Sequence, residues 1–422
     1  MFYDLIYIFG AVLTLPYFLI RAAFAAKYRT GLKEKLGFIP VSHMPSKETV
    51  WFHCVSVGET LASVNLIQEF RKAHPELAVA VSTTTYTGRQ VAEKHDIGDV
   101  YFYYPFDFSW TVSRVVSIVK PNMLVLTELE VWPNMVRTLS RKGIPVGVVN
   151  GRLSARSFRH FSMFRRITGT VFSKLTFCSV QDETYGARFA AAGVPEQRIT
   201  VTGNMKYDSL NEHVDEEKCG EIRKLLNIDE QDMILMGGST HDGEERILLD
   251  AYTSLLPEFP GLRLVLVPRH PERLQAVCTE IKKQGRDFYL KTKLTGEEQD
   301  IRERIIIVDT MGELSMLYSM CTIAFVGGSF SGTGGHNMLE PAVFRKPVIV
   351  GPDTFNFEED MKRLKDHNGI CEVSAEDECA ETVRSLLADQ EKRLQLGKNA
   401  YNVIQQYRGA VRKNAELLEE YF

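Results

Sequence analysis

From Val50 onward the chain alternates short apolar runs with amphipathic segments. The runs WFHCVSV, LAVAVSTT, MLVLTEL and IPVGVVN are each followed by a segment in which apolar residues recur every three or four positions. This alternation is typical of βα units that build a parallel sheet. It stops in a polar, acidic stretch at 208–231 and restarts with MILMGGS, LRLVLVP, RIIIVD, TIAFVGG and KPVIVG. The pattern therefore predicts two α/β halves, each with its own parallel sheet.

The chain length supports the same division. A length of 422 residues exceeds what one hydrophobic core supports, since cores stop growing at roughly 250 to 300 residues. We predict an N-terminal segment at 1–30, a first domain at 31–207 and a second domain at 208–422. The tail from 389 to 422 is predicted to form a long polar helix that packs back across the domains.

The N-terminal segment differs from the rest of the chain. The run 5–20 carries no charge, and it is followed by the basic residues Arg21, Lys27, Arg29, Lys33 and Lys35. As a helix this run rises about 24 Å, less than the roughly 30 Å of a hydrocarbon core, but Arg21 could snorkel and 22–26 could extend the helix. The pattern predicts a single membrane-anchor helix with the two α/β domains on the cytoplasmic face. A cleaved signal peptide is disfavoured, because Asp4 stands where such peptides are basic. Since the segment precedes the first strand, we expect it to contribute to neither core.

Composition narrows the class of protein. A formal net charge of −4 argues against a general affinity for nucleic acid. The seven cysteines are scattered, odd in number and never spaced as CxxC, which indicates neither a disulfide framework nor a thiolate zinc site.

A glycine-rich loop follows the AFVGG run of the second half. The sequence SFSGTGGHNMLEP at 329–341 leads into a predicted helix. Glycines let backbone N–H groups approach a phosphate closely, and a helix N-terminus favours an anion. Asn337 and Glu340 lie three positions apart, and we expect their side chains to form hydrogen bonds with ribose and base groups of a nucleotide. The candidate nucleotide-binding residues of this loop are Gly335, Asn337, Met338, Leu339 and Glu340; the alternative is a flexible loop in which Glu340 is a solvated helix charge.

Other predicted strands of the second half end in polar residues. In an open parallel sheet the loops beyond the carboxyl ends of the strands form the ligand crevice. The candidate residues that follow strands here are Pro268, Arg269, His270, Met311, Gly312 and Glu313. Arg269 could bind a phosphate through two of its guanidinium nitrogens, and the turn at 311–313 could offer backbone groups to a base. Taken alone, an Arg-His pair is more typical of a surface loop.

The first strand of the first half ends in HCVSVGE, which places Glu59 at the mouth of the corresponding crevice. A carboxylate there could act as a general base toward a sugar hydroxyl. The alternative is a helix N-terminal charge that complements the helix dipole.

Eight motifs in order along the chain resemble the Kdo transferases of lipopolysaccharide biosynthesis. They are SVGE at 56–59, STTTYTG at 82–88, ELEVWPN at 128–134, NGRLSARS at 150–157, GNMKYD at 203–208, STHDGEE at 239–245, PRHPER at 268–273 and GGHNMLEP at 334–341. The resemblance implies a GT-B glycosyltransferase, with two Rossmann-like domains facing a central crevice. It also implies an inverting enzyme that needs no metal or cofactor, uses CMP-Kdo as donor and a lipid A precursor as acceptor, and works at the inner membrane.

The resemblance also implies roles for individual residues. By motif match, Glu59 would be the general base, and a Glu of the ELE segment together with Lys206 would stabilise the transition state. The family usually reads ETELWPN, whereas this chain has Leu129 and Val131, so Glu128 and Glu130 both keep their places and either could carry the role. Lys206 could contact the Kdo carboxylate or the leaving phosphate.

Three other functions remain open. A UDP-sugar 2-epimerase shares the two-domain architecture, but it would be soluble, and the SVGE and ELEVWPN motifs argue against it. A non-catalytic protein of the membrane surface would not need carboxylates at strand ends. Another glycosyltransferase with a lipid-linked acceptor is the third alternative.

Overall fold

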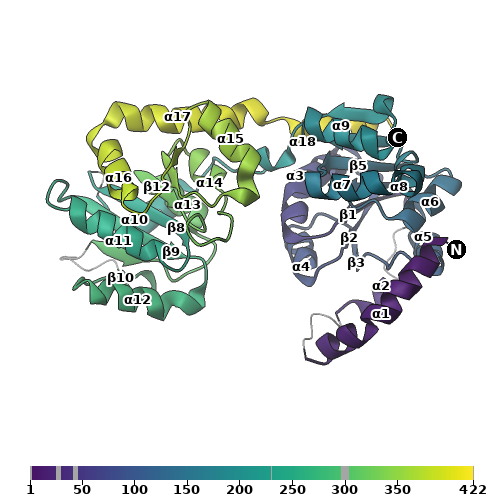
Figure 1. The fold of residues 1–422 in the computed structure, drawn as a ribbon, viewed down its shortest axis with the longest axis horizontal. Coiled ribbons are helices and arrows are strands. Elements are labelled where there is room, and N and C mark those ends of the chain that lie inside the picture. The colour runs from purple at the N-terminus through teal and green to yellow at the C-terminus, as the bar shows by residue number, and fades with distance from the viewer. Residues whose placement is uncertain (1, 25–29, 41–45, 230, 296–303, 422) are drawn as a thin grey trace. The chain divides into compact units, whose positions relative to one another are not determined.

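The computed structural model describes residues 2–24, 30–40, 46–229, 231–295 and 304–421. The chain divides into two compact units: unit 1 is Met1–Ser209 with Tyr407–Phe422, and unit 2 is Leu210–Gln406. Each unit holds a seven-stranded sheet with helices on both faces (Figure 1). Within each sheet the neighbouring strands pair in parallel. The prediction of two Rossmann-like α/β units is therefore confirmed.

Unit 1 is built around a sheet of order β3-β2-β1-β4-β5-β6-β7. Its strands are β1 (Thr49–Cys54), β2 (Ala78–Thr83), β3 (Val100–Tyr103), β4 (Pro121–Thr127), β5 (Val146–Gly151), β6 (Phe177–Val180) and β7 (Ile199–Val201). Its helices are α1 (Phe2–Phe24), α2 (Leu32–Lys35), α3 (Val57–Ala73), α4 (Tyr86–Lys94), α5 (Ser109–Val119), α6 (Pro133–Arg141), α7 (Ala155–Met163), α8 (Arg165–Phe172), α9 (Glu183–Ala192) and α18 (Ala410–Glu419). Every residue of β1, β2 and β5 is buried, which explains why these strands read as continuous apolar runs.

Unit 2 is built around a sheet of order β10-β11-β9-β8-β12-β13-β14. Its strands are β8 (Met233–Thr240), β9 (Leu262–Pro268), β10 (Tyr289–Leu290), β11 (Ile305–Ile307), β12 (Ile323–Val326), β13 (Val348–Val350) and β14 (Cys371–Glu372). Its helices are α10 (Glu216–Leu225), α11 (Glu244–Leu255), α12 (Leu274–Lys283), α13 (Leu314–Met320), α14 (Leu339–Ala342), α15 (Glu358–Asp366), α16 (Glu378–Ala388) and α17 (Gln390–Tyr407).

The strand order reverses near the centre of each sheet. In unit 1 the reversal lies between β1 and β4, and in unit 2 it lies between β8 and β12. Loops diverge at such a switch point, and ligands of open α/β sheets bind there, outside the carboxyl ends of the strands. The two switch points are thus where each unit is expected to carry its chemistry.

The C-terminal tail differs from the single long helix that we expected. It forms two helices, α17 and α18, and the chain turns between them at Gly409, whose φ is 99°. Helix α18 belongs to unit 1, where the Asp208 carboxylate accepts the N–H groups of Gly409 and Val411 at 2.7 and 3.1 Å. The second compact unit therefore ends at Gln406, and the last helix completes the first unit.

Helix α1 is partly integrated into unit 1, so the expectation that it contributes to neither core is wrong. Tyr3 and Asp4 are buried, and Asp4 Oδ1 accepts the Ser109 N–H at 2.7 Å and the Asn134 Nδ2–H at 3.1 Å. The opposite side of the helix is exposed at Leu5, Ile6, Ile8, Phe9, Val12 and Leu13. Within the described residues, no helix is both long and apolar enough to cross a membrane. The sequence did not predict this packing, because Tyr3, Asp4 and Tyr7 change the mean hydropathy of the N-terminal segment very little.

Deleting α1 is expected to lower the free energy of unfolding of unit 1 by about 3 kcal/mol or more, because buried donors would lose their acceptor and buried apolar surface would meet water. Chemical denaturation of the deleted and full-length chains measures this difference. The control is Leu5→Ser with Phe9→Ser, which changes only exposed side chains of the helix. Equal stability of the deleted and full-length chains would contradict the integration of α1.

Candidate active site

Glu59 lies at the switch point of unit 1, in the first turn of α3. Its Oε2 accepts the Val55 N–H at 3.0 Å, and its Oε1 accepts the Ser56 hydroxyl at 3.1 Å. Burial raises the pKa of Glu59 to about 7, the Val55 N–H opposes this shift, and the charges of Glu128 and Glu130 add to it. A carboxyl group with a pKa near 7 is well placed to take a proton at neutral pH.

Glu128 directly follows β4, the strand beside β1. Its φ is 61°, a left-handed conformation that is uncommon outside glycine, and its N–H donates to the Val149 carbonyl at 3.0 Å. Burial raises the pKa of Glu128, whereas the charges of Arg152 and Lys206 lower it. Glu128 is therefore a carboxylate with two cations in its surroundings.

Glu130 has a different environment. Its Oε2 accepts the Trp132 indole N–H at 2.8 Å, and burial raises its pKa. The indole holds the carboxylate beside the start of α6, for which Trp132 is the N-cap residue. The two acids that the sequence left equivalent are thus distinguished by their partners.

Lys206 lies in the short 3-10 helix η4 (Met205–Tyr207), and its ammonium group is 5.7 Å from the centroid of the Tyr207 ring. The Asn150 side chain, at the end of β5, accepts the Met205 N–H at 3.0 Å and so fixes the start of η4. Unit 1 therefore brings Glu59, Glu128, Glu130 and Lys206 to one edge of its sheet.

In unit 2, Glu244 fixes the glycine-rich loop, a role that the sequence did not reveal. Glu244 is fully buried at the start of α11. Its carboxylate accepts four backbone N–H groups at 2.8 to 2.9 Å, those of His241, Gly328, Ser329 and Phe330. These bonds tie the end of β8 to the loop after β12, across the switch point. The STHDGEE motif contains Glu244, but only the fold shows that its partners lie in another loop.

Three histidines lie together next to this loop. The Nε2 atoms of His241 and His336 are 2.8 Å apart, and the ring of His270 meets that of His241 edge-on at 5.4 Å. Burial lowers the pKa of His336 to about 4, and the charges of Arg269, His241 and His270 add to the effect. An anion bound among these groups would be stabilised by the charge of Arg269 and would in turn favour the protonated form of the histidines.

The candidate nucleotide-binding residues of the glycine-rich loop differ in their exposure and in their contacts. Met338 and Leu339 are buried, so they could offer a ligand only backbone atoms. Asn337 donates its Nδ2–H to Glu340 Oε1 at 3.4 Å, and Gly335 has a φ of 77°. The predicted helix, α14, has only four residues, so its dipole adds little, and the expected anion site at a helix start must rest on the loop itself.

The remaining candidates lie at the ends of β9 and β11. Pro268, Arg269 and Met311 line a small cavity of about 50 Å³. Gly312 has a φ of 88°. Glu313 accepts two bonds at 2.9 Å from the Lys291 ammonium group, so its carboxylate is engaged within the unit. His270 is half-exposed.

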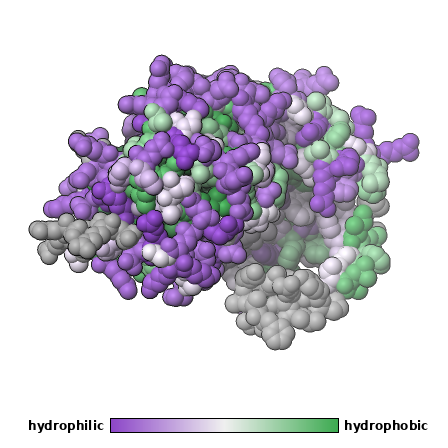
Figure 2. Space-filling view, turned by 60° about the vertical axis from the view of Figure 1, so that its left-hand side comes forward, coloured by the Kyte–Doolittle hydropathy of each residue, from purple (hydrophilic) through white to green (hydrophobic). Residues whose placement is uncertain are grey.

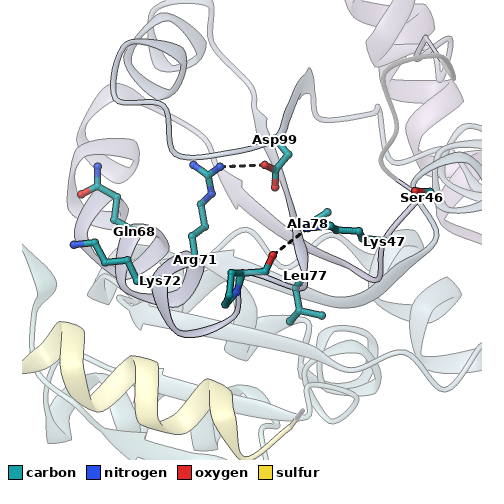
Figure 3. A pocket seen from close by; sticks show the side chains of 9 residues that line it. Ser46, Lys47, Gln68, Arg71, Lys72, Leu77, Ala78 and Asp99 are labelled. Carbon is teal, nitrogen blue, oxygen red and sulfur yellow. Dashed lines mark hydrogen bonds and ion pairs between the residues drawn. The ribbon is translucent and has the colours of Figure 1, made fainter.

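A larger cavity of about 730 Å³ lies elsewhere in unit 1 (Figure 3). Lys47, Ala78 and Asp99, which line it, precede or begin β1, β2 and β3, so it opens at the amino ends of the strands. Two of the three cations that line it are engaged with neighbouring groups: Arg71 pairs with Asp99 at 3.0 Å, and Lys47 donates to the Pro75 carbonyl at 3.0 Å. This cavity is therefore separate from the switch point that gathers the acids.

Comparison with known proteins identifies the family. Residues 30–209 match the family "3-Deoxy-D-manno-octulosonic-acid transferase (kdotransferase)", and residues 226–403 match "Glycosyl transferases group 1". The chain is 37% identical to the 3-deoxy-D-manno-octulosonic acid transferase of Haemophilus influenzae over 94% of this chain and 92% of the relative. It is 32% identical to the enzyme of the same name from Chlamydophila psittaci, over 83% of this chain and 80% of the relative.

A solved structure supports the fold. The UDP-GlcNAc 2-epimerase from Neisseria meningitidis aligns with a TM-score of 0.61 at 14% identity, over 88% of this chain and 100% of that chain. At this identity the likeness concerns the fold alone. The identity to the Haemophilus influenzae enzyme over nearly its whole length shows that the chain belongs to the 3-deoxy-D-manno-octulosonic acid (Kdo) transferase family of glycosyltransferases.

Proposed function

We propose that the protein transfers Kdo from CMP-Kdo to a lipid A precursor, with inversion at the anomeric carbon. The observation that carries the proposal is the cluster at the switch point of unit 1, where Glu59 has a pKa of about 7 beside two further carboxyl groups. Family membership supports the sugar, and the epimerase alternative shares only the fold. In this reaction an acceptor hydroxyl attacks the anomeric carbon of Kdo, and CMP leaves.

Glu59 would act as the general base, taking the proton of the acceptor hydroxyl as the new bond forms. Glu128 would stabilise the positive charge that develops at the anomeric carbon in an oxocarbenium-like transition state. We assign this role to Glu128 rather than Glu130, because Arg152 and Lys206 favour its charged form, whereas Glu130 is bound to Trp132. Lys206 would meet the Kdo carboxylate.

Unit 2 would hold the departing CMP. Arg269 and the histidine cluster of His241, His270 and His336 supply positive charge or N–H donors, and the loop fixed by Glu244 supplies backbone amides. The negative charge of the phosphate needs such partners in the transition state, so no separate acid is required.

Arg269→Ala and Glu340→Ala are each expected to weaken CMP binding by roughly 1.5 to 3 kcal/mol, as for lost hydrogen bonds to charged groups. Isothermal titration calorimetry measures the affinity. Glu391→Ala is the control, since Glu391 is an exposed acid at the start of α17 and is none of the candidate nucleotide-binding residues. Unchanged affinity in both test variants would place the nucleotide elsewhere.

Thermal protection tests the donor class and separates the proposal from the epimerase alternative. CMP should raise the unfolding temperature, because a ligand that binds only the folded state stabilises it. UDP-GlcNAc at the same concentration should have a much smaller effect. Stronger protection by UDP-GlcNAc than by CMP would contradict the proposed donor.

We also propose that the protein lies on the cytoplasmic face of the inner membrane, bound by one side of unit 1. The stretch 131–181 contains nine Lys or Arg residues and no Asp or Glu, although the whole chain has a net charge of −4. Three large apolar residues in this stretch, Met163, Phe164 and Ile167, are exposed around the turn between α7 and α8. Exposed apolar residues of α1 add to this surface, and Figure 2 shows hydrophobic surface beside the grey atoms at the lower right. Mixed apolar and basic surface is what binds an anionic lipid interface.

The basic residues that follow the apolar run 5–20 are only partly available to bind lipid. Lys27 and Arg29 lie outside the described residues, and Lys33 is exposed. Lys35 lies 5.2 Å from the centroid of the Tyr103 ring, and burial lowers its pKa. Lys35 is therefore part of the packing of unit 1.

Replacing Met163 and Phe164 by Ser is expected to weaken binding to vesicles that contain anionic lipid by about tenfold, because less apolar area would enter the interface. Arg165→Gln with Arg166→Gln should cost about 1 kcal/mol per charge, an effect that fades with added salt. Vesicle sedimentation measures both. Leu394→Ser, an exposed apolar position of unit 2, is the matched control. Equal vesicle binding by the Met163/Phe164 variant and this control would contradict the proposed membrane face.

A further inference from the structure

Three buried polar residues and the partly buried Tyr7 form a joint between α1 and the start of α6. Asp4 and Tyr7 come from α1, Asp107 from the segment before α5, and Asn134 from the first turn of α6. The Tyr7 hydroxyl donates to Asp107 Oδ2 at 2.9 Å. The Asn134 side-chain amide donates to Asp4 Oδ1 at 3.1 Å and to the Asp107 carbonyl at 2.6 Å, so both of its N–H bonds are used. We call these residues the α1 joint.

Asp107 caps α6 from outside the helix. Pro133, at the first position of α6, has no N–H, and the N-cap residue Trp132 makes no side-chain capping bond. The next two N–H groups, of Asn134 and Met135, both donate to the Asp107 carboxylate at 2.8 Å. Such groups have no partner within the helix, so this carboxylate holds the helix start in place.

The start of α6 in turn holds the loop with the two candidate catalytic acids. Trp132 directly precedes Pro133, and its indole N–H binds Glu130 at 2.8 Å. Only three residues separate Trp132 from Glu128. The backbone N–H groups of Val131 and Trp132 donate to the carbonyls of Leu129 and Glu130, which makes the loop compact. Movement of the helix start would therefore move the carboxylates.

We propose that the α1 joint positions the catalytic loop, so that the seating of α1 on unit 1 sets the geometry of Glu128 and Glu130. Tyr7, Asp107 and Asn134 are then positioning residues, which act through Trp132 and touch no substrate. The inference rests on the proposed function, since it assigns catalytic work to that loop. It links the amphipathic N-terminal helix directly to the rate of transfer.

Burial raises the pKa of Asp107 to about 6, and the bonds from Asn134, Met135 and Tyr7 oppose this shift. The carboxylate thus depends on its donors to remain charged in a buried place. Removing the Tyr7 hydroxyl takes away one of the three donors and leaves the aromatic ring.

The test uses the full chain labelled with 5-fluorotryptophan, as wild type and as the variants Tyr7→Phe, Asp107→Asn and Tyr3→Phe. The chain has three tryptophans, and Trp132→Phe assigns the resonance of Trp132. Tyr3→Phe is the matched control: it removes a hydroxyl on the same helix, which donates to the Ile167 carbonyl at 3.4 Å. Fluorine NMR, kcat and KM for CMP-Kdo, and CMP affinity are measured for each.

Tyr7→Phe should shift the Trp132 resonance and lower kcat by about 3- to 10-fold, the size expected for one hydrogen bond, with KM for the donor and CMP affinity within about twofold of wild type. Asp107→Asn should act in the same direction and more strongly. Tyr3→Phe should resemble wild type. An unmoved Trp132 resonance with unchanged kcat in Tyr7→Phe, or equal losses of kcat in Tyr7→Phe and Tyr3→Phe, would overturn the inference. If wild type makes no product, the proposed function fails, and the Trp132 resonance alone still tests the joint.

Discussion

Replacing Glu59 by Gln is expected to lower the rate of Kdo transfer by about 10²- to 10⁴-fold, the usual contribution of a general base. The amide keeps the size of the side chain and accepts no proton. The affinity for CMP, measured by calorimetry, should not change, because the proposed nucleotide site lies in unit 2. A variant that keeps more than about half of the wild-type rate would contradict this role, since a general base contributes far more.

From the pKa of Glu59 we predict how the activity and the stability depend on pH. The working form of Glu59 is the carboxylate, so the rate should rise with pH and level off above its pKa of about 7. Folding raises the pKa of Glu59 from 4.5 to about 7, so between these two pH values the folded state binds more protons than the unfolded state. The contribution of Glu59 to the free energy of unfolding therefore falls as the pH rises from 4.5 to about 7. At pH values above this range, Glu59→Gln should therefore unfold at a temperature no lower than that of wild type. This comparison separates lost catalysis from lost structure.

Glu244→Gln is expected to weaken CMP binding by about 3 kcal/mol or more, although Glu244 need not touch the nucleotide. The amide has one oxygen where the carboxylate has two, and its NH₂ group would face N–H donors of the glycine-rich loop. The structure has four such donors on this carboxylate, so at least one of the two oxygen positions loses its bonds. Calorimetry with CMP and thermal unfolding together measure the effect on the loop and on unit 2.

Asp242→Asn is the matched control for Glu244→Gln. Asp242 is also an acid between β8 and α11, but its side chain is 95% exposed and only pairs with Arg273 at 3.0 Å. Its replacement should leave CMP affinity within a factor of about two, as for an exposed ion pair. Equal affinities for CMP in wild type and Glu244→Gln would show that CMP binding does not depend on the bonds between Glu244 and the loop.

The periodic pattern predicted the fold because the strands follow a simple physical rule. Parallel strands covered by helices on both faces are buried along most of their length: β1 is buried at every residue and β4 at every residue except Asn122, so both strands contain a mainly apolar run. The same rule placed Glu59 and Glu128 at strand ends. Their shared site could be inferred once β1 and β4 were known to be neighbours at a switch point.

Other features depend on contacts that no local pattern encodes. The bonds from Gly328, Ser329 and Phe330 to Glu244 span more than 80 positions of sequence. The burial of Asp4 depends on Asn134, and hydropathy averaged over the run around it indicated only a membrane anchor. The length of the helix predicted after the glycine-rich loop was overestimated. Gly and Asn before a Leu-Glu pair are typical of a helix start, but α14 ends after four residues.

Turnover of CMP-Kdo, generated in place, with a lipid A precursor in detergent tests the central claim most directly. Mass analysis of the lipid and quantification of released CMP should show one CMP for each Kdo transferred by wild type, and Glu59→Gln should form almost no product. A lipid that stays unmodified while the folded protein binds CMP, or equal product from wild type and Glu59→Gln, would contradict the account.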